Sequence, residues 1–96
     1  MNYKEYLYCK LAEEAGEVAQ AAMKANIFGE DGVSPVDNLK KSNLQNLVNE
    51  INDMLAVIDL LGHEIPGMAE QRIAPNYFAN KQETIKTYWN IIKEKK

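Results

Sequence analysis

Several features that define other protein classes are scarce or absent in this chain of 96 residues. A single cysteine, Cys9, cannot form a disulfide within the chain, which argues against a disulfide-stabilised secreted domain. The sequence has no apolar run of membrane-spanning length and no signal-like segment, so we expect a cytoplasmic protein. A formal net charge of −3 offers no basic surface to a nucleic acid polymer. We therefore expect neither a nucleic acid polymer nor a membrane among its partners.

Strand-like alternation and internal repeats are also lacking, whereas helical periodicity runs through most of the chain. This pattern predicts an all-α protein, and the length predicts a single helical domain over residues 1–96. The first helix is expected from about residue 3 to 26, where the turn-forming residues of IFGEDGVSP end it.

The later helices are expected from their start and stop signals. A second helix should begin at Ser34–Pro35 and end near Leu61, either continuous or broken near Ser42, where a capping pattern recurs. A last helix should run from about Asn76 to the C-terminus, because apolar residues recur there at helical spacing. Residues 63–75 are the least regular part and are expected to hold at most a short helix.

The first helix carries three glutamates in the segment LAEEAGEVAQAA, and one of them interrupts its apolar side. At about 100° per residue, Glu14 lies only about 60° from Leu11, with Glu17 and Glu13 beside it. The predicted core-facing stripe consists of Leu7, Leu11, Val18, Ala22 and Ala25. A carboxylate on such a stripe is unfavourable unless it is paired or protonated, so we expect a positive charge near Glu14.

The second helix places Glu50 and Asp53 within the apolar segment NEINDMLAVIDLL. Its predicted core stripe consists of Leu44, Leu47, Val48, Ile51, Met54, Leu55 and Ile58. Beyond Asp53 the helix is apolar on nearly every side, interrupted by Asp59. This indicates burial on two sides, against the first helix and against another subunit, so we expect the chain to oligomerise.

Two antiparallel helices joined by one loop can bring the two groups of acids opposite each other. A cluster of carboxylate oxygens suits Mg²⁺ or Mn²⁺, whereas Zn²⁺ would favour histidine or cysteine ligands. The alternative is that these acids are solvated surface residues, which are common on helices. The intrusion of one cluster into an apolar stripe favours the metal site.

The motifs EEAGE, residues 13–17, and EIND, residues 50–53, resemble the EExxE and ExxD motifs of the MazG-like all-α nucleoside triphosphate pyrophosphohydrolase superfamily. The resemblance implies antiparallel helices that form a four-helix-bundle-like unit, completed by assembly into a dimer or tetramer. It also implies Mg²⁺-dependent cleavage of an NTP or dNTP between the α and β phosphates, which yields the monophosphate and pyrophosphate.

The same resemblance implies roles for individual residues. Glu14, Glu17, Glu50 and Asp53 match the Mg²⁺ ligands of the family, for which Mn²⁺ is an alternative ion. Glu13 corresponds either to a further ligand or to the group that orients the attacking water. The spacer between the motifs, residues 18–49, is longer than the family usually shows, and an extended loop holding FGEDGVSPVD would absorb it.

Basic and aromatic residues are expected to complete the substrate site. Lys81 with Asn80 matches the phosphate-binding Asn/Lys segment of the family, although Lys81 also fits a solvated lysine on a basic helix. Lys10 lies on the acidic side of the first helix and can contact phosphate or pair with Glu14. Tyr3 and Tyr6 project from the same side, where they can stack on a base or pack at an interface.

Two alternative functions stay open on the sequence. One is the phosphoribosyl-ATP pyrophosphohydrolase of histidine synthesis, which belongs to the same superfamily and shares a similar acidic pattern. The other is a helical oligomerisation or nucleotide-binding module that retains the acids without hydrolysis.

Overall fold

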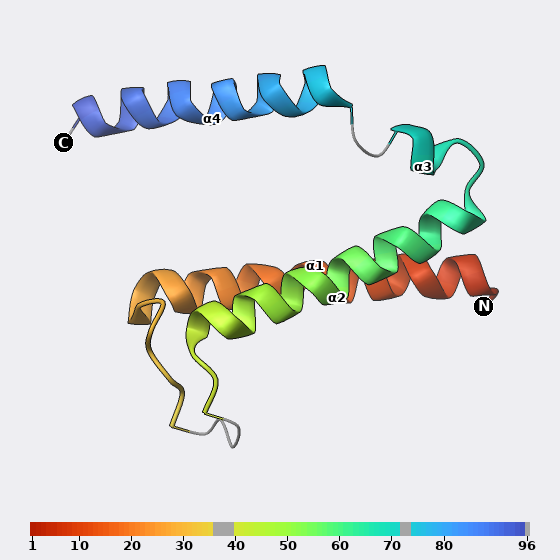
Figure 1. Cartoon of the computed structure of the whole chain (residues 1–96), viewed down its shortest axis with the longest axis horizontal. Helices are drawn as coiled ribbons and strands as arrows, with labels where there is room; N and C mark the ends of the chain where they lie inside the picture. Colours follow the sequence, from red (N-terminus) through yellow and green to blue (C-terminus); the bar gives the residue numbers. More distant parts are fainter. Residues whose placement is uncertain (36–39, 72–73, 96) are drawn as a thin grey trace.

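The computed structural model describes residues 1–35, 40–71 and 74–95, and every regular element within these ranges is a helix. The order is α1 (Tyr3–Phe28), α2 (Asn43–Glu64), α3 (Met68–Gln71) and α4 (Pro75–Glu94), as Figure 1 shows. The all-α class expected from the periodicity is confirmed. Within the described ranges, no helix is both long enough and apolar enough to cross a membrane.

Helix α1 is defined at both ends by local hydrogen bonds. The Asn2 side chain accepts from the Glu5 backbone N–H at 2.8 Å, and Glu5 Oε1 accepts from the Asn2 N–H at 3.1 Å, which forms a capping box. The helix ends at Gly29, whose φ of 91° is accessible to glycine at little cost, and whose N–H donates to the Ala25 carbonyl at 3.0 Å. The helix therefore extends two residues beyond the predicted end.

Helix α2 begins at the second of its two predicted start signals. Ser42 Oγ accepts from the Gln45 N–H at 3.0 Å, which caps the helix at Asn43. Ser34 and Pro35 lie in the loop instead, and the residues that would follow in a helix from that start, 36–39, lie outside the described residues. The helix continues past the predicted end at Leu61, through Gly62, and ends at Glu64, two residues before Pro66.

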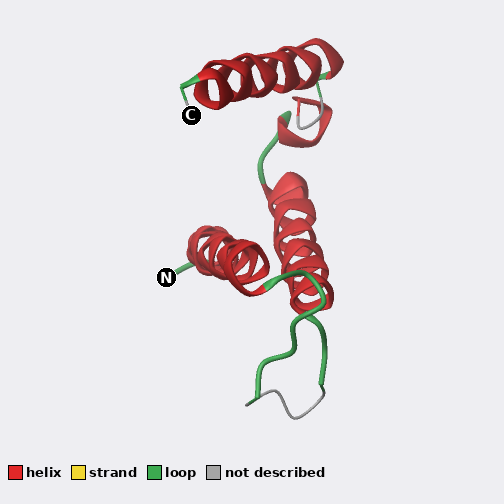
Figure 2. Ribbon diagram, turned by 90° about the vertical axis from the view of Figure 1, so that its left-hand side faces the viewer, coloured by secondary structure: helices red, strands yellow, loops and turns green. Residues whose placement is uncertain are grey.

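Helices α1 and α2 run side by side in opposite directions, with α2 inclined to α1 (Figures 1 and 2). Leu7 from the start of α1 is buried with Val57 and Leu61 from the end of α2, and three partly buried residues pack against them, namely Leu11, Ile65 and Met68. At the other end of the pair, Ala21 and Asn43 are buried. The middle of the contact between the two helices is where Glu14 and Glu50 lie.

The faces that meet differ from the predicted stripes. On α1 the less exposed residues are Leu7, Lys10, Leu11, Glu14, Val18, Ala21 and Ala25. The contact face is therefore centred about 30° closer to Glu14 than the predicted stripe, and Ala22 is exposed. On α2 the face is turned by about 80° toward Glu50, and three residues of the predicted stripe are half exposed, namely Leu44, Val48 and Leu55. The other four residues of the stripe, Leu47, Ile51, Met54 and Ile58, are less exposed, as predicted. The prediction was wrong for the three half-exposed residues because α2 is apolar over a wide arc, and the side of that arc nearest Glu50 contacts α1.

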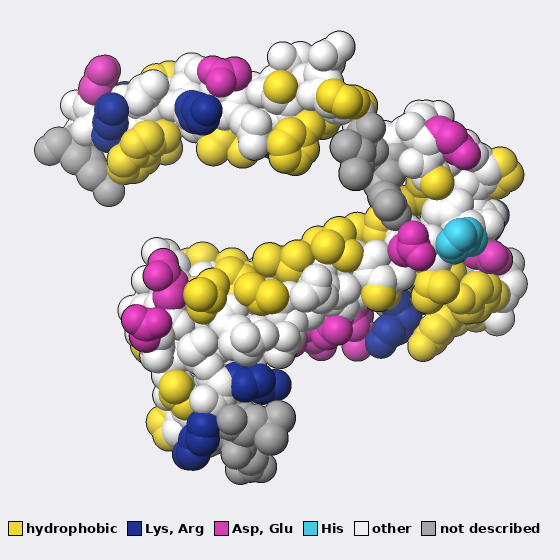
Figure 3. Space-filling view, in the orientation of Figure 1, with side chains coloured by type: hydrophobic (Ala, Val, Ile, Leu, Met, Phe, Trp, Pro, Cys, Tyr) yellow, Lys and Arg dark blue, Asp and Glu magenta, His cyan; other side chains and the backbone are white. Residues whose placement is uncertain are grey.

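Helix α4 has Pro75 in its first turn. Both its start and its end lie within one or two residues of the predicted positions. Over the part of the chain that the structure describes, α4 makes no contact with α1 or α2. Its large apolar side chains are consequently exposed, with Phe78 at 61%, Trp89 at 56% and Ile92 at 49%. Figure 3 shows hydrophobic side chains along the sides of α2 and α4 that face each other.

Candidate metal centre

Three carboxylates from two helices converge where α1 and α2 pack together. One carboxylate oxygen from each of Glu14, Glu50 and Asp53 lies within 4.8 Å of the others. Glu50 and Asp53 are three positions apart on α2 and therefore share one side of that helix, while Glu14 approaches from the contact face of α1. The three oxygens are close enough together to coordinate one cation.

Two of these carboxylates are poorly solvated and incompletely paired. The Glu14 side chain is only 12% exposed, and its Oε2 atom is buried without a hydrogen-bond partner. Oε2 of Glu50 is buried in the same way. Buried carboxylate oxygens without a donor are unfavourable, and they are rare in folded proteins unless a cation, water or proton satisfies them. Hard oxygen ligands of this kind fit a small divalent cation.

The surroundings of Glu14 and Glu17 make the charged forms of these two carboxylates less favourable than in water. Desolvation raises the pKa of Glu14, with further contributions from the negative charges of Glu17 and Asp53, while Lys10 opposes them. The pKa of Glu17 is also raised, first because its carboxyl group shares a hydrogen bond with Glu50 and then because of the charge of Glu50. A divalent cation would relieve both shifts by supplying positive charge.

Lys10 and Glu13 lie at the edge of this cluster. Lys10 Nζ is 3.3 Å from Glu13 Oε1 and 3.8 Å from Glu14 Oε1. The hydrogen bond to Glu13 is the largest cause of the raised pKa of Lys10. Lys10 thus supplies the positive charge expected near Glu14, but most of its interaction is with Glu13, whose side chain is 55% exposed.

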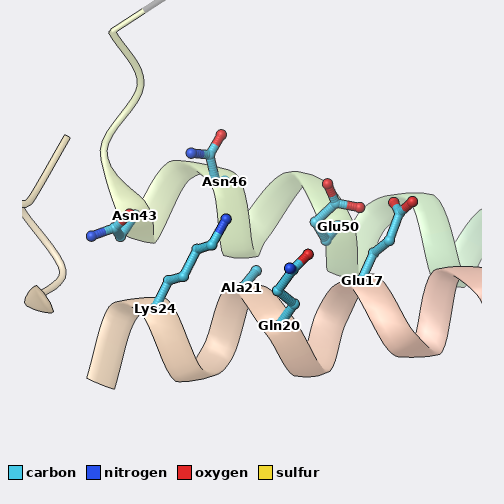
Figure 4. Close-up of a pocket in the computed structure, with 7 residues that line it drawn as sticks. All are labelled: Glu17, Gln20, Ala21, Lys24, Asn43, Asn46 and Glu50. Atoms are coloured by element: carbon cyan, nitrogen blue, oxygen red, sulfur yellow. The ribbon is translucent and has the colours of Figure 1, made fainter. Parts of the chain in front are cut away.

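A polar cavity of about 300 Å³ adjoins the cluster along the groove between α1 and α2 (Figure 4). Its lining consists of Glu17, Gln20, Ala21 and Lys24 of α1 with Asn43, Asn46 and Glu50 of α2. Because Glu17 and Glu50 border both the cluster and the cavity, a ligand held by a cation at the cluster can extend into the cavity.

The amides and the lysine of this cavity were not identified from the sequence. Gln20 and Lys24 follow Glu17 by three and seven positions, and Asn46 precedes Glu50 by four, so all lie on the same sides of their helices as the acids. This helical spacing was the available signal. It was weak, because uncharged amides occur on any exposed helix face.

The remaining predicted site residues belong neither to the cluster nor to the polar cavity beside it. Lys81 and Asn80 lie on α4, which contacts neither α1 nor α2 over the described residues. Tyr3 and Tyr6 lie in the first turns of α1, half exposed at 51% and 48%, and line neither the polar cavity nor the second cavity described below. Within one chain, the structure thus brings together the acids and Lys10 but not the other predicted substrate contacts.

Comparison with known proteins finds no counterpart for this arrangement. None of the family models, curated proteins or solved structures searched matches the chain.

Proposed function

We propose that the protein is a Mg²⁺-dependent nucleoside triphosphate pyrophosphohydrolase related to the MazG-like superfamily. The observation that carries the proposal is the convergence of Glu14, Glu50 and Asp53 within 4.8 Å, on the two motifs that resemble those of the family. The buried, unpartnered oxygens of Glu14 and Glu50 support it, because a bound cation is one of the partners that would satisfy them.

The chain's own residues would divide the work between metal binding and water positioning. Glu14, Glu50 and Asp53 would be the primary ligands, and Glu17, whose carboxyl group shares a hydrogen bond with Glu50, would be a further ligand. Glu13 is exposed and held by Lys10, so it is available to orient a water molecule. The bound cation would neutralise phosphate charge and lower the pKa of a coordinated water.

Self-association is part of the proposal. The outer face of α2 and the apolar face of α4 both lack a partner over the described residues, and together they expose more large apolar side chains than soluble monomers commonly tolerate. A second copy would cover both faces and complete a four-helix-bundle-like unit, as a dimer or tetramer. Lys81 and Asn80 would then reach an acidic cluster only from the α4 of a neighbouring subunit.

One observation favours a second candidate, a nucleotide- or metal-binding module without hydrolysis. The predicted phosphate-binding residues on α4 are separate from the acids within the chain, as they would be if they took no part in catalysis.

A pyrophosphate-release assay distinguishes the candidates. With Mg²⁺, the common NTPs and dNTPs would be tested beside phosphoribosyl-ATP, and release from at least one ordinary nucleotide is expected. Release from phosphoribosyl-ATP alone would assign the rival activity from histidine synthesis. Nucleotide binding without any release would instead identify the non-catalytic module.

A further inference from the structure

Residues 32–35 of the loop after α1 form one wall of a second, partly open cavity of about 380 Å³, which continues the polar one. The two cavities share Lys24 and Asn43. The rest of the second cavity's lining comes from the end of α1 and the loop, namely Phe28, Gly32, Val33, Ser34 and Pro35. The acidic cluster, the polar cavity and the loop cavity therefore follow one another along the groove between α1 and α2.

The described part of the loop is held in place by hydrogen bonds to the first residues of α2. Asn43 is only 6% exposed; its side chain donates to the Gly29 carbonyl at 2.9 Å and its backbone N–H donates to the Gly32 carbonyl at 2.7 Å. The Leu44 N–H donates to the Glu30 carbonyl at 2.9 Å. These bonds use N–H groups that a helix start leaves without partners, so the loop wall is formed before any ligand binds.

Gly32 permits the close approach of the loop to α2. A Cβ atom at this position would lie 2.8 Å from the Phe28 carbonyl oxygen and 2.9 Å from Asn43 Nδ2. Both distances are too short for a side chain, so the loop packs in this way only because residue 32 is a glycine. The sequence of the spacer therefore specifies the shape of this cavity wall.

The chemistry of the groove changes along its length. The cluster offers carboxylates for a cation, the polar cavity offers the amides of Gln20 and Asn46, and the loop cavity offers Val33, Pro35 and the ring of Phe28. A nucleoside triphosphate changes in the same order, from metal-bound phosphates to a hydroxylated sugar and then to a flat base. Amides donate and accept hydrogen bonds with hydroxyl groups, and aromatic rings stack on bases.

We propose that the end of α1 and residues 32–35 of the loop that follows it form a nucleoside-binding element: the polar cavity takes the sugar, and the loop cavity takes the base against Phe28. This assignment rests on the proposed pyrophosphohydrolase function. Phe28 is 70% exposed in the free chain, so its ring is available to stack. The assignment moves base recognition away from Tyr3 and Tyr6, which lie at the opposite end of α1.

The test uses the full chain, Mg²⁺ and the nucleotide that the wild type hydrolyses fastest, with inorganic triphosphate as a competitor that lacks the nucleoside. Phe28→Ala should raise KM about tenfold, since base stacking on one aromatic ring contributes about that much to affinity. Its kcat should change less than about twofold, and the inhibition constant of inorganic triphosphate should be unchanged. Val33→Trp, which fills the loop cavity, should raise KM in the same selective way. Ile27→Ala is the matched control, because Ile27 is exposed next to Phe28 but lines neither cavity.

Each other outcome overturns the assignment in a recognisable way. An active wild type whose KM is unaffected by both cavity variants would refute the nucleoside pocket and leave the pyrophosphohydrolase intact. If the inhibition constant of inorganic triphosphate rose together with KM, these residues would act on the phosphates or on the folding of the loop and not on the nucleoside. A wild type that releases no pyrophosphate from any nucleotide would refute the proposed function, and this inference with it, before any variant is made.

Discussion

The addition of Mg²⁺ or Mn²⁺ should raise the thermal stability of the protein substantially. The cluster of Glu14, Glu50 and Asp53 would form the proposed cation site, and its carboxylates converge only when α1 and α2 are packed together. A cation that binds only the folded state stabilises it by about 2.7 kcal/mol when its concentration is 100-fold above Kd. For a domain of this size each kcal/mol corresponds to about 4–8 °C, so the melting temperature should increase by about 10–20 °C.

Differential scanning fluorimetry over a metal titration, with and without nucleotide, measures this increase. Glu50→Gln should abolish most of it, because a neutral amide is a poor ligand for a hard cation. Asp59→Asn is the matched control on the same helix, since Asp59 lies 3.6 Å from His63 and outside the cluster. Equal increases in Glu50→Gln and Asp59→Asn, or none in the wild type even with nucleotide present, would refute the reasoning.

Three further predictions follow from the same cluster and from the exposed apolar faces. Without metal, the melting temperature should rise as the pH falls from 7 toward about 5. The reason is that the pKa values of Glu14 and Glu17 are raised in the folded chain above the value near 4.5 that glutamates have in the unfolded chain. The folded chain therefore binds protons more tightly than the unfolded chain in this range. A Glu14→Gln variant that kept the full rise would contradict this origin. Asp53→Asn should abolish turnover and increase metal-free stability, whereas Asp59→Asn should stay within a few-fold of the wild-type rate; equal losses would mean that the ligands are wrongly assigned. Light scattering at micromolar concentration should give at least twice the chain mass of 10.9 kDa, and a stable monomer would disprove self-association.

Helix limits were largely predictable from the sequence because short-range chemistry determines them. Ser42 is an N-cap for the residues that follow it, and Gly29 and Pro66 end helices through their own backbone preferences. The competing start at Ser34–Pro35 has the same local signature. Local signals alone could not decide between the two starts, because the hydrogen bonds from α2 to the loop carbonyls depend on the tertiary packing.

The orientation of α2 was not predictable in the same way. A helix with apolar residues on two sides can present either side to its neighbour, and the side with Leu44, Val48 and Leu55 has more large apolar residues than the side with Glu50. The choice depends on which face fits α1, where Glu14 occupies a contact position. An apolar count therefore placed the centre of the contact face too far from Glu50.

The sequence indicated the residues of the acidic cluster but not the two cavities. Glu14 was recognisable because a charge at a stripe position is unusual, and Glu50 and Asp53 share the spacing of one helix side. The loop cavity depends on contacts between Gly32, Phe28 and Asn43 that no periodic pattern encodes. Phe28 appeared only as part of a turn-rich segment, so the role proposed for it could be inferred only from the structure.

Phosphorus NMR of the reaction products tests the central claim most directly. A nucleoside triphosphate incubated with the wild type and Mg²⁺ should be converted to the monophosphate and pyrophosphate, with no diphosphate or free phosphate, and Asp53→Asn should leave it intact. Cleavage to the diphosphate and phosphate, or unchanged conversion by Asp53→Asn, would contradict the assignment of this cluster as the metal centre of a pyrophosphohydrolase.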